Sequence, residues 1–205
     1  VVDYPTVYYK PPPVNVTLVG SAFGRVQLGS ANNNYYHRDP PCVLWVRDST
    51  VGAEADDRAD HGVYINRAHM GWSMDIERSA VYADEIALFM DGRLCGNCYV
   101  RVADSNLTVE QTHTATPQTT HVLPPVAAFV VWHTDERSVM VFERVTVSVT
   151  NPDGYGSKAL KGLSVDMWHR GAFRVIDSRV AVVGNSTTVD GVHVGTIRDR
   201  RAPCV

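Results

Sequence analysis

The sequence is poor in charged residues and in the residues that dominate helices. Only 20% of its 205 residues are charged, and the formal net charge is −3, which argues against a basic nucleic-acid-binding protein. Leucine occurs 9 times against 33 valines, and β-branched side chains favour strands. No apolar run approaches the roughly 18 residues that a membrane-spanning helix needs, so we expect no direct membrane insertion by this segment.

The pattern along the chain predicts an all-β fold. Ten or more short segments are strand-like, with alternation of apolar and polar residues clearest over 139–150 and 163–168, and turn residues separate them. No helices alternate with these strands, and no period of 20–50 residues repeats, which argues against a solenoid or a propeller. We therefore predict an antiparallel β-sandwich with Greek-key connections, either Ig-like or jelly-roll-like.

The domain boundaries follow from composition. Residues 1–13 contain a proline run and are predicted to be an extended leader, 14–197 a single β-sandwich domain, and 198–205 a basic C-terminal tail. At most one short helix is expected, near 73–83, where apolar residues recur every three or four positions; two strands are the alternative. We favour a hairpin over 85–102, with its turn at Asp91-Gly92.

Three glycosylation motifs and four cysteines point to the secretory pathway. The motif Asn-X-Ser/Thr begins at Asn15, Asn106 and Asn185. The cysteines form an even set with three open pairings, Cys42, Cys95, Cys98 and Cys204. We read the Cys-X-X-Cys motif as structural, since a strand-like segment follows it and no second ligand pair stands nearby for zinc. We expect an extracellular or luminal protein, for which the virion surface is one setting.

The basic tail contains a sequence that proprotein convertases would cut. Arg198, Arg200 and Arg201 match the pattern Arg-X-Lys/Arg-Arg. A secreted chain could be processed there, and an uncut solvated tail is the alternative. The tail also contains Cys204, which would tether it if the thiol is paired.

No sequence motif for catalysis stands out. The nucleophile elbow, the zinc-protease motif, the phosphate-binding loop and the dinucleotide fingerprint are all missing. The eight histidines share no i,i+2 or i,i+4 spacing. The acidic pairs Asp75/Glu77 and Asp84/Glu85 could serve a glycosidase only at a defined separation, which the sequence does not reveal. We expect a protein without enzymatic activity, metal or cofactor, with a secreted hydrolase as the second alternative.

Recognition of a protein partner is the function that we expect. Tyrosine and arginine are favoured at interfaces, and both occur in a loop-like segment of which we select five residues, Asn34, Tyr35, Tyr36, His37 and Arg38. Trp72, beside Gly71 and Ser73, is the tryptophan with a surface-like setting. The partner would be a cell-surface receptor or a soluble immune ligand, as for a viral envelope or immune-evasion glycoprotein. A carbohydrate-binding module is the first alternative, and a homodimer is left open.

Overall fold

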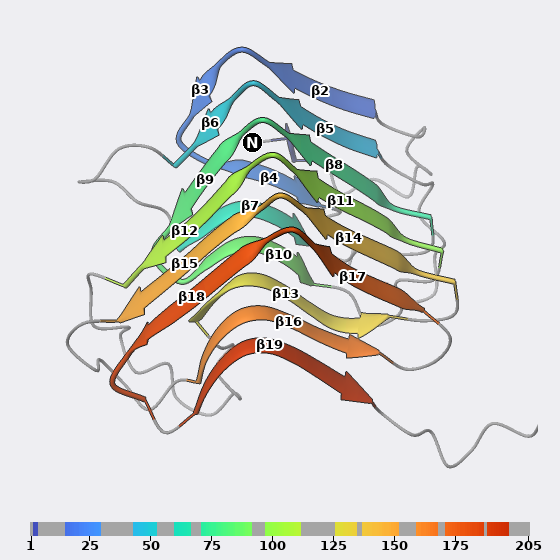
Figure 1. Cartoon of the computed structure of the whole chain (residues 1–205). Helices are drawn as coiled ribbons and strands as arrows, with labels where there is room; N and C mark the ends of the chain where they lie inside the picture. Colours follow the sequence, from blue (N-terminus) through green and yellow to red (C-terminus); the bar gives the residue numbers. More distant parts are fainter. Residues whose placement is uncertain are drawn as a thin grey trace, which may run out of the picture.

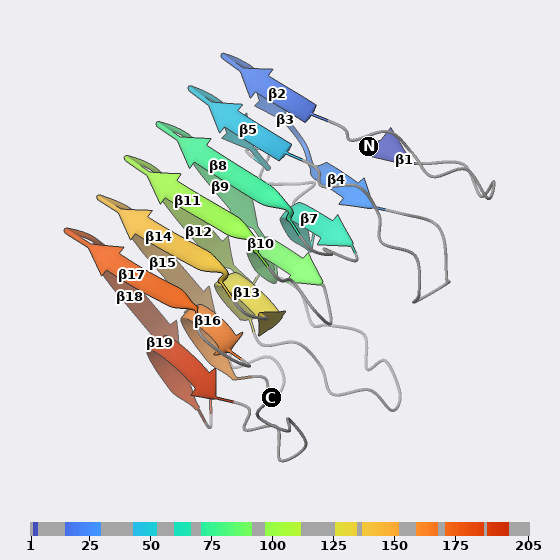
Figure 2. The ribbon, with the colours of Figure 1, turned by 90° about the vertical axis from the view of Figure 1, so that its right-hand side faces the viewer.

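The protein is a solenoid of parallel β-strands, as the computed structural model shows (Figures 1 and 2). The structure describes residues 2–3, 15–29, 43–52, 60–66, 71–91, 97–111, 126–134, 137–151, 159–167, 171–186 and 188–196. Every strand pairing within these residues is parallel, and the strands lie in three sheets, one of seven strands and two of six. The part of the chain that the structure describes contains no helix long and apolar enough to cross a membrane.

Each sheet takes every third strand of the chain. Sheet A contains β1 (Val2–Asp3), β4 (Val26–Gly29), β7 (His61–Asn66), β10 (Ile86–Asp91), β13 (Val126–Thr134), β16 (Leu160–Met167) and β19 (Val189–Thr196). Sheet B contains β2 (Asn15–Val19), β5 (Val43–Arg47), β8 (Ser73–Glu77), β11 (Tyr99–Ala103), β14 (Val139–Glu143) and β17 (Ala172–Ile176). Sheet C contains β3 (Ala22–Phe23), β6 (Thr50–Val51), β9 (Ala80–Ala83), β12 (Asn106–Glu110), β15 (Thr146–Asn151) and β18 (Arg179–Gly184).

One turn of the solenoid, which we call a coil, consists of three consecutive strands, one each in sheets B, C and A. Six coils stack, from β2–β4 to β17–β19 (Figure 1). The sheet B strands stack without a register shift, so that one residue of each coil stands beside the equivalent residue of the next. Equivalent side chains therefore form columns that run along the solenoid axis.

The columns that point inward make the core. In sheet B the column Leu44, Met74, Val100 and Met140 is fully buried. Two phenylalanines pack against each other across the core: the rings of Phe129 in sheet A and Phe142 in sheet B lie 5.0 Å apart, edge to face. Alternation of apolar and polar residues along each strand thus places one apolar set inside the solenoid.

The outer face of sheet A carries a second, smaller apolar cluster. The rings of His61, Tyr64 and Phe89 stack with centroids 5.1–5.3 Å apart. Ile86, Phe89, Ala127 and Val130 of this cluster are buried. Strands of sheet A are therefore apolar on both faces, as is usual for parallel sheets.

The prediction of an all-β protein is confirmed, but the prediction of an antiparallel sandwich is wrong. Alternation shows that one face of a strand is buried, and it does not specify the direction of the neighbouring strand. The sequence shows no period of the solenoid, because the length of its repeat varies. The sheet B strands begin at residues 15, 43, 73, 99, 139 and 172, and successive starts are 26 to 40 residues apart.

Two local predictions are also wrong. The segment 73–83, expected as a short helix, forms β8 and β9 on either side of a tight bend. The hairpin expected over 85–102 does not exist, since β10 belongs to sheet A and β11 to sheet B. Of the expected leader, the structure describes the two residues of β1, and the tail 198–205 lies outside the described residues.

Candidate functional site

The bend from sheet B to sheet C has the same construction in all six coils. Two residues join the strands, and the first has a positive φ of 47° to 62°: Gly20, Asp48, Arg78, Asp104, Arg144 and Asp177. Serine follows in every coil except the fifth, which has Val145. Side chains larger than glycine seldom adopt this left-handed conformation, so the arginines are held there by other contacts.

The serines form a ladder of hydrogen bonds beneath the bend. The Ser79 hydroxyl donates to the Glu77 carbonyl at 2.8 Å and accepts the Ser49 backbone N–H at 3.2 Å. The Ser79 N–H in turn donates to the Ser105 hydroxyl at 3.1 Å. Each hydroxyl therefore closes its own turn and satisfies a backbone donor of the preceding coil, as local side-chain hydrogen bonds do at turns.

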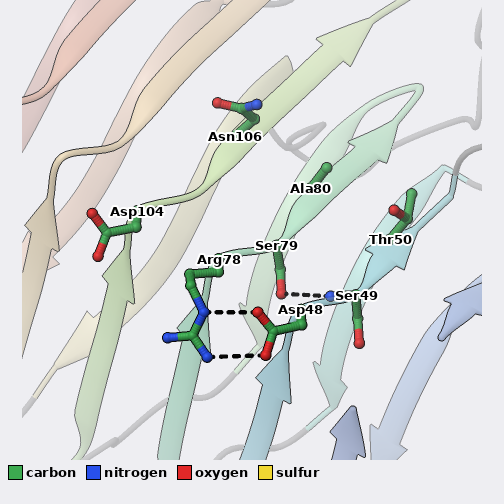
Figure 3. Close-up of a pocket in the computed structure, with 8 residues that line it drawn as sticks. All are labelled: Asp48, Ser49, Thr50, Arg78, Ser79, Ala80, Asp104 and Asn106. Atoms are coloured by element: carbon green, nitrogen blue, oxygen red, sulfur yellow. Dashed lines mark hydrogen bonds and ion pairs between the residues drawn. The ribbon is translucent and has the colours of Figure 1, made fainter. Parts of the chain in front are cut away.

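The residues of positive φ form an alternating charge column, which we call the corner ladder: Asp48, Arg78, Asp104, Arg144 and Asp177. The Arg78 guanidinium donates to both Asp48 carboxylate oxygens at 2.7 and 2.9 Å (Figure 3). Arg144 holds both Asp104 oxygens at 2.6 and 2.8 Å. The hydrogen bond from Arg78 lowers the pKa of Asp48, and the hydrogen bond from Arg144 lowers the pKa of Asp104.

The outer face of sheet B next to this ladder is polar. We call it the sheet B face and define it by six outward side chains, Trp45, Arg47, Asp75, Glu77, Tyr99 and Arg101. Their alternate neighbours on β5 and β8, such as Leu44 and Ile76, are buried in the core, so these side chains point away from it.

Ion pairs tie the sheet B face together. The Arg101 Nη1 lies 3.0 Å from an Asp75 oxygen. Arg47 lies 3.9 Å from the other Asp75 oxygen and 3.6 Å from Glu77. Trp45, half-buried, stands beside Asp75 in the register of β5 and β8. The face therefore combines an aromatic side chain with carboxylates and guanidiniums whose positions the rigid sheet fixes.

A shallow groove of about 460 Å³ runs along the bend between sheets B and C (Figure 3). Asp48, Arg78, Ser79 and Asp104 line it, together with the exposed Asn106 of the second glycosylation motif. The groove adds a charged margin to the sheet B face. In the described ranges, no group of three or more His, Cys, Asp or Glu side chains could hold a metal ion.

The structure describes some of the site residues selected from the sequence. Trp72, expected at the surface, is 4% exposed and packs in the core, since it precedes β8 at a position facing inward. Asn15, Asn106 and Asn185 are exposed. Cys98 is buried and disulfide-bonded.

The other selected residues lie outside the described residues. These are the recognition segment 34–38, three cysteines and the processing motif: Asn34, Tyr35, Tyr36, His37, Arg38, Cys42, Cys95, Cys204, Arg198, Arg200 and Arg201. The cysteine pairing, the recognition segment and the cleavage therefore stay predictions. Trp45, Arg47 and Arg101 are not among the residues selected from the sequence, in which the apolar neighbours of Trp45 indicate a core position.

The acidic pair Asp75 and Glu77 lies on one face of β8, as alternate residues of a strand must. Each carboxylate contacts two guanidinium groups. Asp75 contacts those of Arg47 and Arg101, and Glu77 contacts those of Arg47 and Arg78. Both carboxylates are thus already engaged with cations, an arrangement suited to holding a polar ligand.

No family model, curated protein or solved structure matches this chain. Its function must therefore be argued from the arrangement of its own side chains. The geometry of the sheet B face is fixed by five in-register strand pairings.

Proposed function

We propose that the protein is a carbohydrate-binding protein of the secretory pathway, which holds a glycan on the sheet B face. The observation that carries this proposal is the position of Trp45. Its half-buried side chain points outward and stands in register with Asp75, whose carboxylate lies 3.0 Å from Arg101. An aromatic ring thus adjoins charged groups that can donate and accept hydrogen bonds.

The chemistry of these groups suits a sugar. A pyranose ring has an apolar C–H face that packs against an aromatic ring, and aromatic side chains provide large apolar contact areas. Its hydroxyl groups both donate and accept, so that Asp75 accepts from one hydroxyl while Arg101 or Arg47 donates to its neighbour. A few polar groups that converge beside an apolar surface are typical of small-ligand sites.

The size of the face favours a ligand smaller than a protein. Six strands about 4.8 Å apart and five residues long, at about 3.3 Å per residue, cover about 24 by 16 Å, or about 400 Å². A stable protein interface buries about 800 Å² on each partner. The whole outer side of sheet B is about half of that area, and the sheet B face on β5, β8 and β11 is smaller still, which fits an oligosaccharide.

A protein partner remains the second candidate, because Tyr99 on this face is 40% exposed and lies on the outward side of β11 together with Arg101. Tyrosine, tryptophan and arginine are enriched where interfaces are strongest. Such a partner would have to extend over the groove and onto sheet C to reach the usual area.

The secretory origin is supported by the three exposed motif asparagines, Asn15, Asn106 and Asn185. Glycosylation requires an accessible asparagine in a chain that enters the secretory pathway. Expression in a secreting eukaryotic cell should yield a chain whose mass falls on treatment with peptide-N-glycosidase. An unchanged mass would contradict this part of the proposal.

A glycan array with the full chain tests the binding function. We expect binding to a defined set of oligosaccharides, and Trp45→Ala and Asp75→Asn should each reduce affinity about tenfold or more, which is about 1.4 kcal/mol. Val141→Ala is the matched control, since Val141 lies in the same outward column and is not part of the charged cluster. Absence of any glycan signal, with capture of a purified cell-surface protein that Trp45→Ala abolishes, would favour the second candidate.

A further inference from the structure

The groove along the bend ends at one of the glycosylation motifs. On its sheet C side, Ala80 lies in register between Thr50 and Asn106, and all three side chains point outward (Figure 3). Ala80 has only a methyl group, so the surface is lowest directly beside Asn106. The exposed Asn106, which begins the motif Asn-Leu-Thr, therefore borders the hollow of the groove.

The groove extends from Asn106 in one direction. The column of outward side chains continues on the other side with Thr146 and Arg179, and neither residue lines the groove. Ala80 and Thr50, which do line it, lie on the side of the earlier coils. A group attached to the Asn106 side chain can therefore enter the groove from its end.

The facing wall of the groove belongs to the corner ladder and offers fixed hydrogen-bond acceptors. The carboxylates of Asp48 and Asp104 line this wall. Two hydrogen bonds from Arg78 hold the first carboxylate, and two from Arg144 hold the second. A carboxylate has about four acceptor positions, so each can accept further hydrogen bonds. A ligand that is rich in hydroxyl and amide donors fits this wall.

We propose that the groove holds the chain's own glycan, attached to Asn106. In that modification the Asn106 Nδ2 exchanges one proton for a bond to C1 of an N-acetylglucosamine, and the lipid pyrophosphate that carried the sugar leaves and takes up the proton. The hydroxyl groups and the acetamide N–H of this sugar donate to Asp104 and Asp48, and its C–H groups pack on the Ala80 methyl. The inference rests on the proposed secretory origin and is independent of glycan binding by the sheet B face.

The rate at which peptide-N-glycosidase releases each glycan tests the proposal, because the enzyme must reach the bond at the asparagine. The full chain is expressed in a secreting eukaryotic cell, and release at each site is followed by mass spectrometry of its peptides. Asn15 and Asn185 are exposed and do not line the groove, so they serve as internal controls. Under native conditions we expect release at Asn106 to be about tenfold slower or more. After denaturation the three rates should be similar.

Ala80→Arg fills the hollow beside Asn106 and should expel the glycan, which raises its native release rate to that at Asn185. Thr146→Arg is the matched control, since it adds the same side chain next to Asn106 on the side away from the groove, and it should leave release slow. Arginine already occupies this column at Arg179, so the urea midpoints of both variants should stay near that of the parent.

Equal native release from all three sites of the parent would overturn the proposal. So would release at Asn106 that stays equally slow in Ala80→Arg, because the obstacle would then not be the groove. Glycans at Asn15 and Asn185 with an unmodified Asn106 would overturn this inference and leave the secretory origin intact. A chain without a glycan at any of the three sites would overturn both.

Discussion

Replacement of Ser79 by alanine tests whether the serine ladder stabilises the solenoid. Its hydroxyl donates to the Glu77 carbonyl and accepts the Ser49 N–H. In the variant the Glu77 carbonyl still accepts the Asp48 N–H at 3.1 Å, so the main loss falls on the buried Ser49 donor. A buried donor without an acceptor costs about 1–3 kcal/mol, and we expect Ser79→Ala to lower the free energy of unfolding by about that amount.

Urea denaturation of the full chain measures the effect, as a lower midpoint at an unchanged slope. Ser148→Ala is the matched control, because Ser148 faces outward on β15 and is only half-buried; its effect should stay within about 0.5 kcal/mol. If Ser79→Ala and Ser148→Ala are equally mild, the hydrogen bond from Ser49 contributes nothing and the argument from the ladder fails. A change of slope in Ser79→Ala alone would show that the variant alters the cooperativity of unfolding.

Three further predictions concern the core, the bends and acid. Phe142→Ala removes a fully buried ring that contacts Phe129, so calorimetry should show a loss of about 3–5 kcal/mol; a loss below 1 kcal/mol would contradict it. Gly52→Ala should be far more destabilising in urea than Gly20→Ala, since both have positive φ but only at Gly52 would a Cβ collide with a backbone atom, the Tyr82 carbonyl oxygen. The lowered pKa values of Asp48 and Asp104 predict that their stabilisation is complete above about pH 4 and is lost as pH falls further; the double variant to asparagine should flatten the dependence of the urea midpoint below that pH.

The strands themselves were largely predictable from the sequence, and their direction was not. Alternation locates β14 and β15 within 139–150, but the bend at Arg144 is invisible, because an arginine in a left-handed conformation is rare. The continuous apolar run that became β13 was the better signal. A strand that is apolar on both faces is typical of parallel sheets, and residues 126–131 are indeed buried throughout.

The candidate site was less predictable than the fold. The sequence shows Trp45 among apolar neighbours and Trp72 beside glycine, and the structure reverses their expected exposure. The reason is the phase of the alternation: Leu44 and Val46 face the core, so Trp45 between them must face outward. Asp75 and Glu77 were recognisable as a pair on one strand face, whereas the arginine partners of Asp75, Arg47 and Arg101, come from neighbouring coils and are not indicated by any local pattern.

The connections between the strands differ in length. The connection from sheet B to sheet C takes two residues in every coil, while the connections from C to A and from A to B range from two residues to more than ten. We therefore expect an inserted tag or domain to be tolerated in the connections from sheet C to A and from A to B, and to disrupt folding in the connection from B to C. The bend from sheet B to sheet C thus has a constant length, and the coils differ in length only at the other two connections.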